Sequence, residues 1–181
     1  MSRDDCRLGG TSPPAAGAVL ALVMLLAALT AAGCKEKEAP APPRAPAPAE
    51  MPQRLPTATI DVGRIALVVE VAKEEATRRK GMMFRTQVGP DEAMLFVFDR
   101  DSNLAFWMKN TPVDLDLAYI RSDGVITQIE RMKANVVAPV FSREPVRLGL
   151  EVPAGWFEKH GVAVGTKVAV PPEVTSPAKT P

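Results

Sequence analysis

The placement of proline decides which part of this chain can fold. Of the 181 residues, 18 are proline, and they gather near the N-terminus. The segment KEKEAPAPPRAPAPAEMPQRLP, Lys35 to Pro56, is charged and then rich in proline and alanine, a pattern that blocks helices and sheets and favours extended polyproline II. We therefore predict a tether over residues 34–56, a folded domain over residues 57–170 and a disordered tail over residues 171–181.

The segment before the tether has the pattern of a signal peptide. A short polar start with Arg3 and Arg7 precedes the apolar run AAGAVLALVMLLAALTAAGC, which ends at Cys34. Such a run ended by small residues predicts a signal peptide over residues 1–33, with a retained signal-anchor helix as the alternative. TAAGC also resembles the lipobox of bacterial lipoproteins, which implies that Cys34 is lipidated and becomes the first residue of the mature chain.

The same resemblance carries an expectation about location. Lys35 stands where an aspartate would favour the inner membrane in well-studied Gram-negative bacteria. We therefore expect a cell-envelope protein that is anchored by lipid in the outer membrane and faces the periplasm. Processing would also remove Cys6, which would leave no free thiol in the mature protein.

The composition argues against several functional classes. The chain has 22 Lys and Arg and 21 Asp and Glu, so its formal net charge is +1. This balance gives no basic footprint for nucleic acid. Two cysteines and one histidine leave almost no material for a zinc site, a disulfide framework or a Cys–His catalytic pair. We predict no metal, no cofactor and no nucleic-acid partner.

Short β-branched and apolar runs dominate the predicted domain. The dipeptide Asp123-Gly124 between two such runs predicts a β-hairpin. In the charged segment Lys73 to Lys80, acidic residues come early and basic residues late, which favours a short helix with Gly81 at its C-terminal cap. We predict a mainly β, monomeric domain, either sandwich-like or a partly closed barrel with one short helix, with a β-rich α+β fold as the alternative. The predicted strands cover residues 64–72, 93–99, 104–110, 115–120, 125–130 and 146–153, and residues 166–170 close the domain.

The stretch FWMKNTPVDLDLAYI, Phe106 to Ile120, carries polar residues that a core strand does not need. Strand alternation places Asp116 on one face with Ala118 and Ile120, so its carboxylate needs donors or a cation. Arg85, Lys109 and Asn110 are the candidate partners. Asp116 is interpreted first as a structural anchor, with ligand binding and catalysis as alternatives. We also expect the strand over residues 104–110 to be covered on both faces, and Asp114 to repel Asp116.

Several motifs occur together in order along the predicted domain. VEVAKEEATRRKGMMFR, AMLFVFD, FWMKNT, LDLAYIRSDGVI and LGLEVPAGWFEKHGVAVGTKV resemble those of the bacterial and archaeal family named domain of unknown function 192. The resemblance implies a mainly β, sandwich-like domain and implies no activity. Ala93 and Asp114 depart from the family pattern, which usually has glycine and proline there, so Asp114 adds a charge beside Asp116.

The family motifs and the strand pattern together select residues for a site. We expect a membrane-tethered, non-catalytic β module that binds a small molecule, a glycan or an envelope protein. The alternatives are an enzyme that uses Asp116 with Arg85 or Lys109, and a purely structural accessory subunit. An enzyme needs these groups to converge in one concave pocket. The candidate ligand-binding residues are Arg85, Trp107, Lys109, Asn110, Asp116 and Glu151.

Overall fold

The computed structural model describes residues 51–176. The predicted signal peptide, Cys34 and most of the predicted tether lie outside the described residues. Within residues 51–176 no helix is long and apolar enough to cross a membrane.

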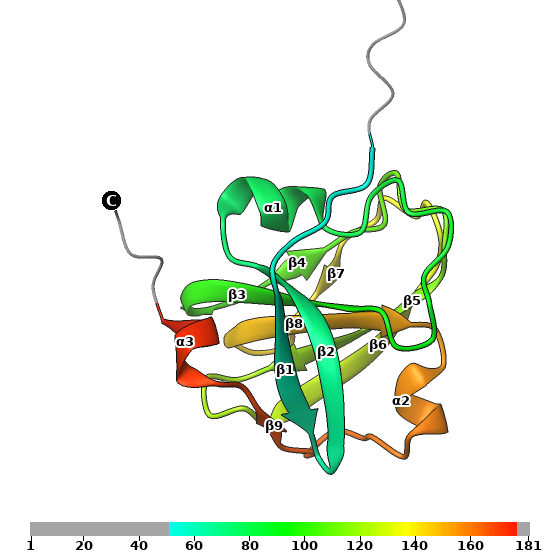
Figure 1. Ribbon diagram of the computed structural model, residues 1–181. Helices are drawn as coiled ribbons and strands as arrows, with labels where there is room; N and C mark the ends of the chain where they lie inside the picture. Colours follow the sequence, from blue (N-terminus) through cyan, green and yellow to red (C-terminus); the bar gives the residue numbers. More distant parts are fainter. Residues whose placement is uncertain (1–50, 177–181) are drawn as a thin grey trace, which may run out of the picture. The chain divides into compact units, whose positions relative to one another are not determined.

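The domain is mainly β, as predicted, and its helices are short (Figure 1). The strands are β1 (Thr57–Val62), β2 (Ile65–Ala72), β3 (Ala93–Ser102), β4 (Ala105–Phe106), β5 (Leu115–Ile120), β6 (Ile126–Met132), β7 (Val140–Phe141), β8 (Val146–Pro153) and β9 (Val168–Ala169). The helices are α1 (Glu75–Lys80), α2 (Trp156–Lys159) and α3 (Pro172–Thr175).

Seven strands form one strongly curled sheet in the order β6-β5-β8-β3-β2-β1-β9. All neighbouring pairs are antiparallel except β2 and β3, which are parallel. The two ends of the sheet meet, because Val125 bridges Lys167 and the Val168 N–H donates to the Gly124 carbonyl at 2.7 Å. The curl therefore makes a partly closed barrel, one of the two forms expected from the sequence.

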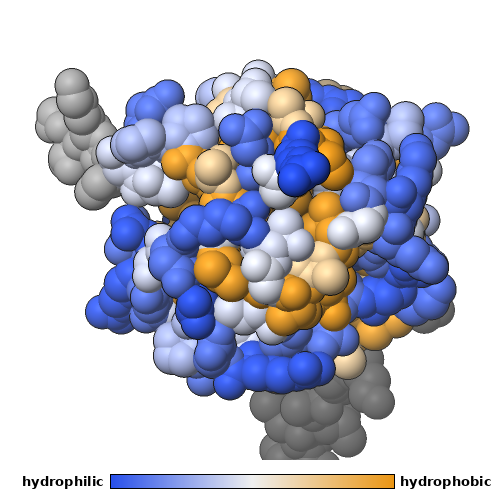
Figure 2. All heavy atoms as spheres, turned by 90° about the horizontal axis from the view of Figure 1, so that it is seen from below, coloured by the Kyte–Doolittle hydropathy of each residue, from blue (hydrophilic) through white to orange (hydrophobic). Residues whose placement is uncertain are grey.

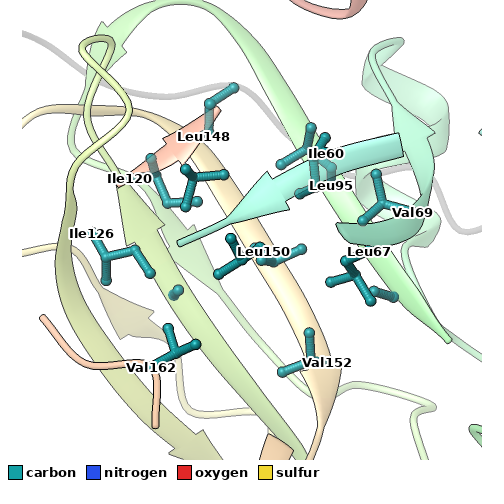
Figure 3. Close-up of a cluster of buried hydrophobic side chains, with 14 of the residues drawn as sticks. Ile60, Leu67, Val69, Leu95, Ile120, Ile126, Leu148, Leu150, Val152 and Val162 are labelled. Carbon is teal, nitrogen blue, oxygen red and sulfur yellow. The ribbon is translucent and has the colours of Figure 1, made fainter. Parts of the chain in front are cut away.

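The interior of the curl holds the first hydrophobic core. Because side chains alternate along a strand, β8 sends Leu148, Leu150 and Val152 inward, where they meet residues from both ends of the sheet such as Ile60 and Ile126 (Figure 3). Trp156 and Phe157 of α2 join this core. Figure 2 views the molecule from below Figure 1, and there hydrophobic residues gather in the middle of the face within a rim of hydrophilic ones.

A second core lies on the opposite face of the sheet, under the two-stranded sheet of β4 and β7. Phe106 of β4 rests directly on Gly149, where an added Cβ would lie 2.5 Å from the phenyl ring. Its ring also meets Phe96 and Tyr119 edge to face, at centroid distances of 5.0 and 5.7 Å. The Tyr119 hydroxyl donates to the Val140 carbonyl at 2.6 Å. The missing side chain at Gly149 thus lets the small sheet pack closely on the large one.

The strand expected over residues 104–110 is shorter than predicted, because only β4 pairs. Asn110 has a left-handed backbone with φ of 54°, and the Thr111 N–H donates to the Met108 carbonyl, so the chain turns before Pro112. Phe106 and Met108 are buried as expected, but Trp107 is 47% exposed. The expectation that both faces of this segment are covered is therefore wrong.

The packed domain also extends beyond the expected boundaries. Gln53 donates from its side chain to the carbonyls of Thr77 and Gly81 at 2.8 and 2.9 Å, although it belongs to the predicted tether. At the other end, Pro172–Thr175 form α3, and Val174 is buried in the first core. Proline at the start of a helix is well tolerated, so residues 171–176 pack on the domain in place of the frayed chain that was expected.

Candidate functional site

The carboxylate of Asp116 is bound from within the domain, which favours the structural anchor, the first of the three interpretations drawn from its sequence context. Its side chain is 5% exposed. One carboxylate oxygen accepts from the Gly155 N–H at 2.7 Å, and the guanidinium of Arg131, directly opposite on β6, pairs with the carboxylate. The cation is therefore Arg131 and not Arg85 or Lys109, because the hairpin register places Arg131 across from Asp116. Gly155 has φ of 86°, so Asp116 holds the left-handed turn that begins α2.

Asp114 does not repel Asp116 in the way that the strand pattern predicted. It lies before the start of β5, and its carboxylate pairs with Lys133 at 2.7 Å and accepts from the Ala134 N–H at 2.8 Å. The hydrogen bond from Lys133 and that from Ala134 lower the pKa of Asp114. Each aspartate thus has a cation of its own.

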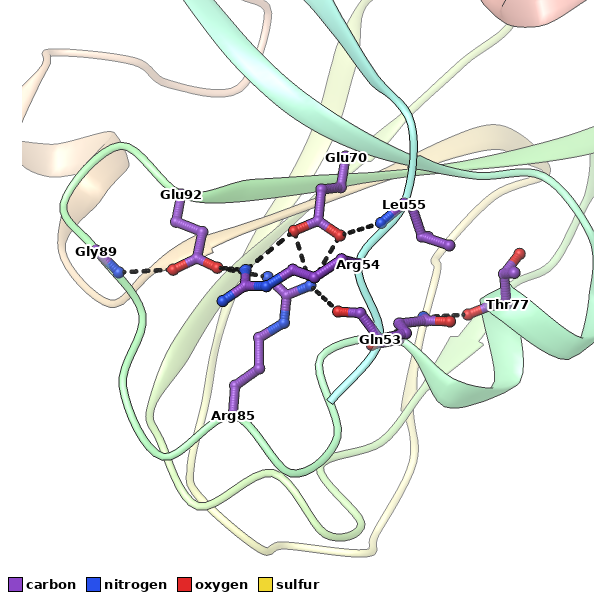
Figure 4. A network of polar contacts seen from close by, with 9 residues as sticks. Gln53, Arg54, Leu55, Glu70, Thr77, Arg85, Gly89 and Glu92 are labelled. Atoms are coloured by element: carbon purple, nitrogen blue, oxygen red, sulfur yellow. Dashed lines mark hydrogen bonds and ion pairs between the residues drawn. The ribbon is translucent and has the colours of Figure 1, made fainter. Parts of the chain in front are cut away.

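Arg85 forms the centre of a second polar network (Figure 4). Its guanidinium, 1% exposed, donates to both carboxylate oxygens of Glu70 at 2.8 Å, to Glu92 at 2.7 Å and to the Gln53 carbonyl at 2.9 Å. Arg54 pairs with the same two glutamates from the solvent side. Two arginines and two glutamates balance in charge, and together they fasten residues 53–55 and the loop 81–92 to β2.

Glu92 shows how strongly this network favours ionised carboxylates. Partial burial opposes its charge, yet hydrogen bonds from the Gly89 N–H and Arg54 and the charge of Arg85 outweigh that effect, so the pKa of Glu92 lies below its usual value. The network is thus satisfied from inside the domain. Among the buried side-chain atoms of this network, the Arg85 Nε alone lacks a partner within the described residues.

A pocket of about 240 Å³ opens between α1, β3 and β4. We call it the Glu151 pocket. Its walls are mostly apolar, and Glu151 of β8 is a buried acidic group at its surface. The last turn of α1 supplies the basic residues. The lining residues are Glu75, Arg78, Arg79, Lys80, Gly81, Met82, Met83, Phe96, Phe98, Ala105, Phe106, Trp107 and Glu151.

Glu151 differs from the other buried carboxylates, because no hydrogen bond or ion pair within residues 51–176 reaches it. It is 4% exposed and lies on the second-core face, next to Met94 of β3 and Leu117 of β5. Burial raises its pKa to about 8, although the charge of Arg85 lowers it somewhat. At neutral pH the Glu151 carboxyl is therefore mostly protonated, and it can donate a hydrogen bond into the pocket.

The structure brings only some of the predicted site residues together. Trp107 and Glu151 line the same pocket, and Arg85 lies close enough for its charge to act on Glu151. Lys109 and Asn110 are exposed, and the Asn110 carbonyl accepts from the Phe84 N–H at 2.7 Å. Asp116 is held elsewhere by Arg131. Within residues 51–176 no group of three or more His, Cys, Asp or Glu is placed to hold a metal ion.

Sequence reasoning missed several residues that matter here. Glu70 stands inside the apolar strand IALVVEVA, and an acidic residue in such a run is a signal for a buried partner. Arg131 was detectable from the hairpin register. The aromatic wall carried no comparable signal, because Phe96, Phe98 and Phe106 resemble ordinary core residues in the sequence.

Comparisons with known proteins agree with this fold. The family model DUF192, described as Uncharacterized ACR, matches residues 58–170. The chain belongs to the DUF192 family. The family resemblance of the sequence motifs is thereby confirmed. A search of curated proteins gives no match.

Two solved structures are similar to this DUF192 domain. One, from Sinorhizobium meliloti 1021, is described as that of a candidate transcription regulator; it is 36% identical, with a TM-score of 0.62 over 64% of this chain and 95% of that one. The other, a protein of unknown function from Novosphingobium aromaticivorans DSM 12444, is 27% identical, with a TM-score of 0.61 over 67% of this chain and 94% of that one. The likeness thus spans nearly all of each relative.

We expect Asp116→Ala to lower the free energy of unfolding by about 1–3 kcal/mol, because it leaves the Gly155 N–H without its acceptor. The Arg131 side chain is 45% exposed and can turn to water, which limits the loss. Asp116→Asn should cost less, since the amide oxygen still accepts from Gly155. Urea melts measure this, with the exposed Asp61→Ala as the control. Wild-type stability in Asp116→Ala would remove the basis for the anchor role.

The raised pKa of Glu151 predicts a pH dependence of stability. Its ordinary pKa is 4.5 and its folded value is about 8, so the folded state binds this proton more tightly. The contribution of Glu151 to the free energy of unfolding is complete below about pH 4.5 and is lost as the pH rises through about 8. Each pKa unit corresponds to about 1.4 kcal/mol. Because the pKa of Glu92 is lowered, its contribution is lost only below its ordinary pKa of 4.5, outside this window.

Urea melts of wild type and Glu151→Gln at about pH 5.5 and about pH 9 test this prediction. Wild type should lose stability between the two pH values by more than the variant does, because the glutamine cannot ionise. The difference between the two proteins isolates Glu151 from all other titrating groups. Parallel pH profiles would show that Glu151 ionises normally and would contradict the assignment.

Proposed function

We propose that this DUF192 protein is a non-catalytic binding module of the cell envelope that holds a small molecule in the Glu151 pocket. The observation that supports this most directly is the buried Glu151 carboxyl, which has no partner within residues 51–176 and lies in a pocket walled by aromatic rings. Ligand sites are mostly apolar clefts with a few well-placed polar groups. A ligand would supply the hydrogen-bond partner that the domain itself does not.

The size of the pocket bears on the class of ligand. At about 240 Å³ it is slightly smaller than the usual range of ligand pockets, roughly 300–1,000 Å³. It suits a small molecule better than an extended glycan or a segment of an envelope protein. A purely structural accessory subunit would have no need of an unpaired buried acid.

The enzyme alternative has less support from the geometry. Asp116 and Arg85 sit in separate networks, and each is occupied by its own partners. Lys109 is exposed and joins neither network. The residues of that mechanism therefore do not converge. One relative is described as a candidate transcription regulator. This description does not alter the proposal, because a net charge of +1 gives no sign of the excess of basic residues that nucleic-acid binding needs.

The N-terminal sequence supports a location in the cell envelope for this protein. TAAGC resembles a lipobox, and Lys35 follows Cys34, which supports lipid attachment in the outer membrane with the domain facing the periplasm. At about 3.1 Å per residue, an extended tether gives a reach of several tens of ångströms. The pocket would then sample the space near the membrane surface.

The pocket is tested with the full-length purified protein and a library of small fragments, followed by ligand-observed NMR. We expect compounds that bind wild type and lose binding in Ala105→Trp, because Ala105 lines the pocket and a large ring there would fill it. Val164→Trp, at an exposed position outside the lining, is the control. A library in which no compound distinguishes these two variants would count against the pocket as a binding site.

The anchor is tested by replacing the cysteine that the lipobox identifies. Cys34→Ala should abolish incorporation of labelled palmitate and release the protein from the detergent-extracted membrane fraction, because no acyl acceptor remains. Cys6→Ala is a matched control that should keep both properties, since Cys6 lies in the predicted signal peptide. Palmitate labelling that persists in Cys34→Ala would place the anchor elsewhere.

A further inference from the structure

The Glu151 pocket has two chemically different ends. Its most buried polar group is the Glu151 carboxyl, with Phe96 and Phe106 also buried in its walls. At the other end, consecutive residues of the last turn of α1 bring three basic side chains, Arg78, Arg79 and Lys80. The Arg79 side chain is 72% exposed, so this end is the mouth and Glu151 is the floor.

The two ends of the pocket differ in charge, and the basic side chains differ in whether they are already paired. Arg79 pairs with Glu75 at 3.4 Å. Arg78 donates to the Lys73 and Val97 carbonyls, which are neutral acceptors, and its guanidinium lies 4.8 Å from the centre of the Phe98 ring. The Lys80 carbonyl accepts from the Met83 N–H at 3.0 Å, but its ammonium group has no hydrogen bond or ion pair within residues 51–176. The mouth therefore carries a net positive charge, while the floor is a carboxyl that is mostly protonated at neutral pH.

This arrangement favours an anion with an apolar body. A ligand cation would meet the positive mouth on entry and would find no carboxylate at the floor at neutral pH. A ligand carboxylate would be attracted to the mouth, and its body would pack against the aromatic rings. A carbonyl or ether oxygen at its far end would accept the hydrogen bond that Glu151 has free to give.

We infer that the Glu151 pocket binds a small organic acid, with its carboxylate at Lys80 and Arg79, its apolar body against the aromatic residues of the lining, and a hydrogen-bond acceptor at Glu151. This inference rests on the proposed function and narrows it to one class of ligand. The pocket volume of about 240 Å³ limits that class to molecules of roughly the size of a substituted benzoate.

Binding should depend on pH through Glu151. Other ionisable groups face the same region, but burial and the charges of Glu130 and Glu151 raise the pKa of Tyr119 above its usual value, so it stays protonated. Glu70 is fixed by Arg85. When Glu151 ionises, it can no longer donate to the ligand and repels an acceptor oxygen. The charged or titratable groups around it are Glu70 of β2, Arg85 of the loop 81–92, Tyr119 of β5, Glu130 of β6, and Glu75, Arg78, Arg79 and Lys80 of α1.

Three matched probes test the inference on the full-length protein. They are 4-acetylbenzoate, an acid with an acceptor; 4-isopropylbenzoate, an acid without one; and 4-acetylbenzylamine, a cation with the same acceptor. Isothermal titration calorimetry at about pH 6.5 should rank 4-acetylbenzoate tightest, by about tenfold over the amine and several-fold over the isopropyl compound. Its affinity should fall several-fold as the pH rises through about 8.

Variants separate the two ends of the pocket. Glu151→Gln keeps a donor but cannot ionise, so it should bind 4-acetylbenzoate without the pH dependence. Lys80→Gln should weaken both benzoates and leave the amine unaffected or improved. Lys159→Gln, an exposed lysine of α2 outside the lining, is the matched control and should leave the affinity of each probe unchanged.

The result also distinguishes this inference from the proposal on which it rests. Tighter binding of the amine, or an affinity for 4-acetylbenzoate that rises with pH, would overturn the organic-acid inference while leaving a pocket that binds small molecules. Failure of all three probes would overturn the inference as well. If the fragment library then yields compounds that Ala105→Trp excludes, the binding function survives without it.

Discussion

The buried guanidinium of Arg85 is the interaction on which the cover of the sheet depends. A charge that is 1% exposed is very costly unless opposite charges and hydrogen-bond acceptors surround it. Glu70, Glu92 and the Gln53 carbonyl supply those partners from three separate parts of the chain. Satisfying one charge therefore fixes the segment before β1 and the loop after α1. Gln53 then binds the end of α1, which positions the basic mouth of the Glu151 pocket.

The same network explains why Glu151 has no cation bound to its carboxyl group. Glu70, Met94 and Glu151 lie side by side on β2, β3 and β8, so both glutamates face the second core. Arg85 binds both oxygens of Glu70. It makes no hydrogen bond to Glu151, and only its positive charge acts on that carboxyl group. Two acids on one face thus acquire opposite properties. Glu70 is bound by a cation, whereas Glu151 is desolvated and mostly protonated at neutral pH.

Much of the fold could be predicted because its signals are local. The Asp123-Gly124 turn and the alternation along β5 and β8 are read from neighbouring residues. The pairing shifts by one residue between Tyr119 and Ile120, and beyond that irregularity Asp116 lies opposite Arg131. The end of β4 could not be predicted in this way, because the left-handed turn at Asn110 depends on contacts with residues far away in the sequence. The partners of Arg85 are 7, 15 and 32 residues distant, and no periodic pattern connects them.

The contrast between Asp116 and Glu151 bears most directly on function. Both are buried carboxyl groups on adjacent strands. Asp116 is ion-paired and hydrogen-bonded within the domain, so all of its interactions stabilise the fold. Glu151 contributes no such bond, and its oxygens are not fully enclosed, since the fully buried side-chain atoms without a partner in residues 51–176 are the Arg85 Nε and the Trp156 Nε1. Removing most of the water around a carboxyl group still has a cost. An apolar residue at that position would avoid the cost. Within the described domain only the pocket, whose volume opens onto this carboxyl, offers a place for the missing partner.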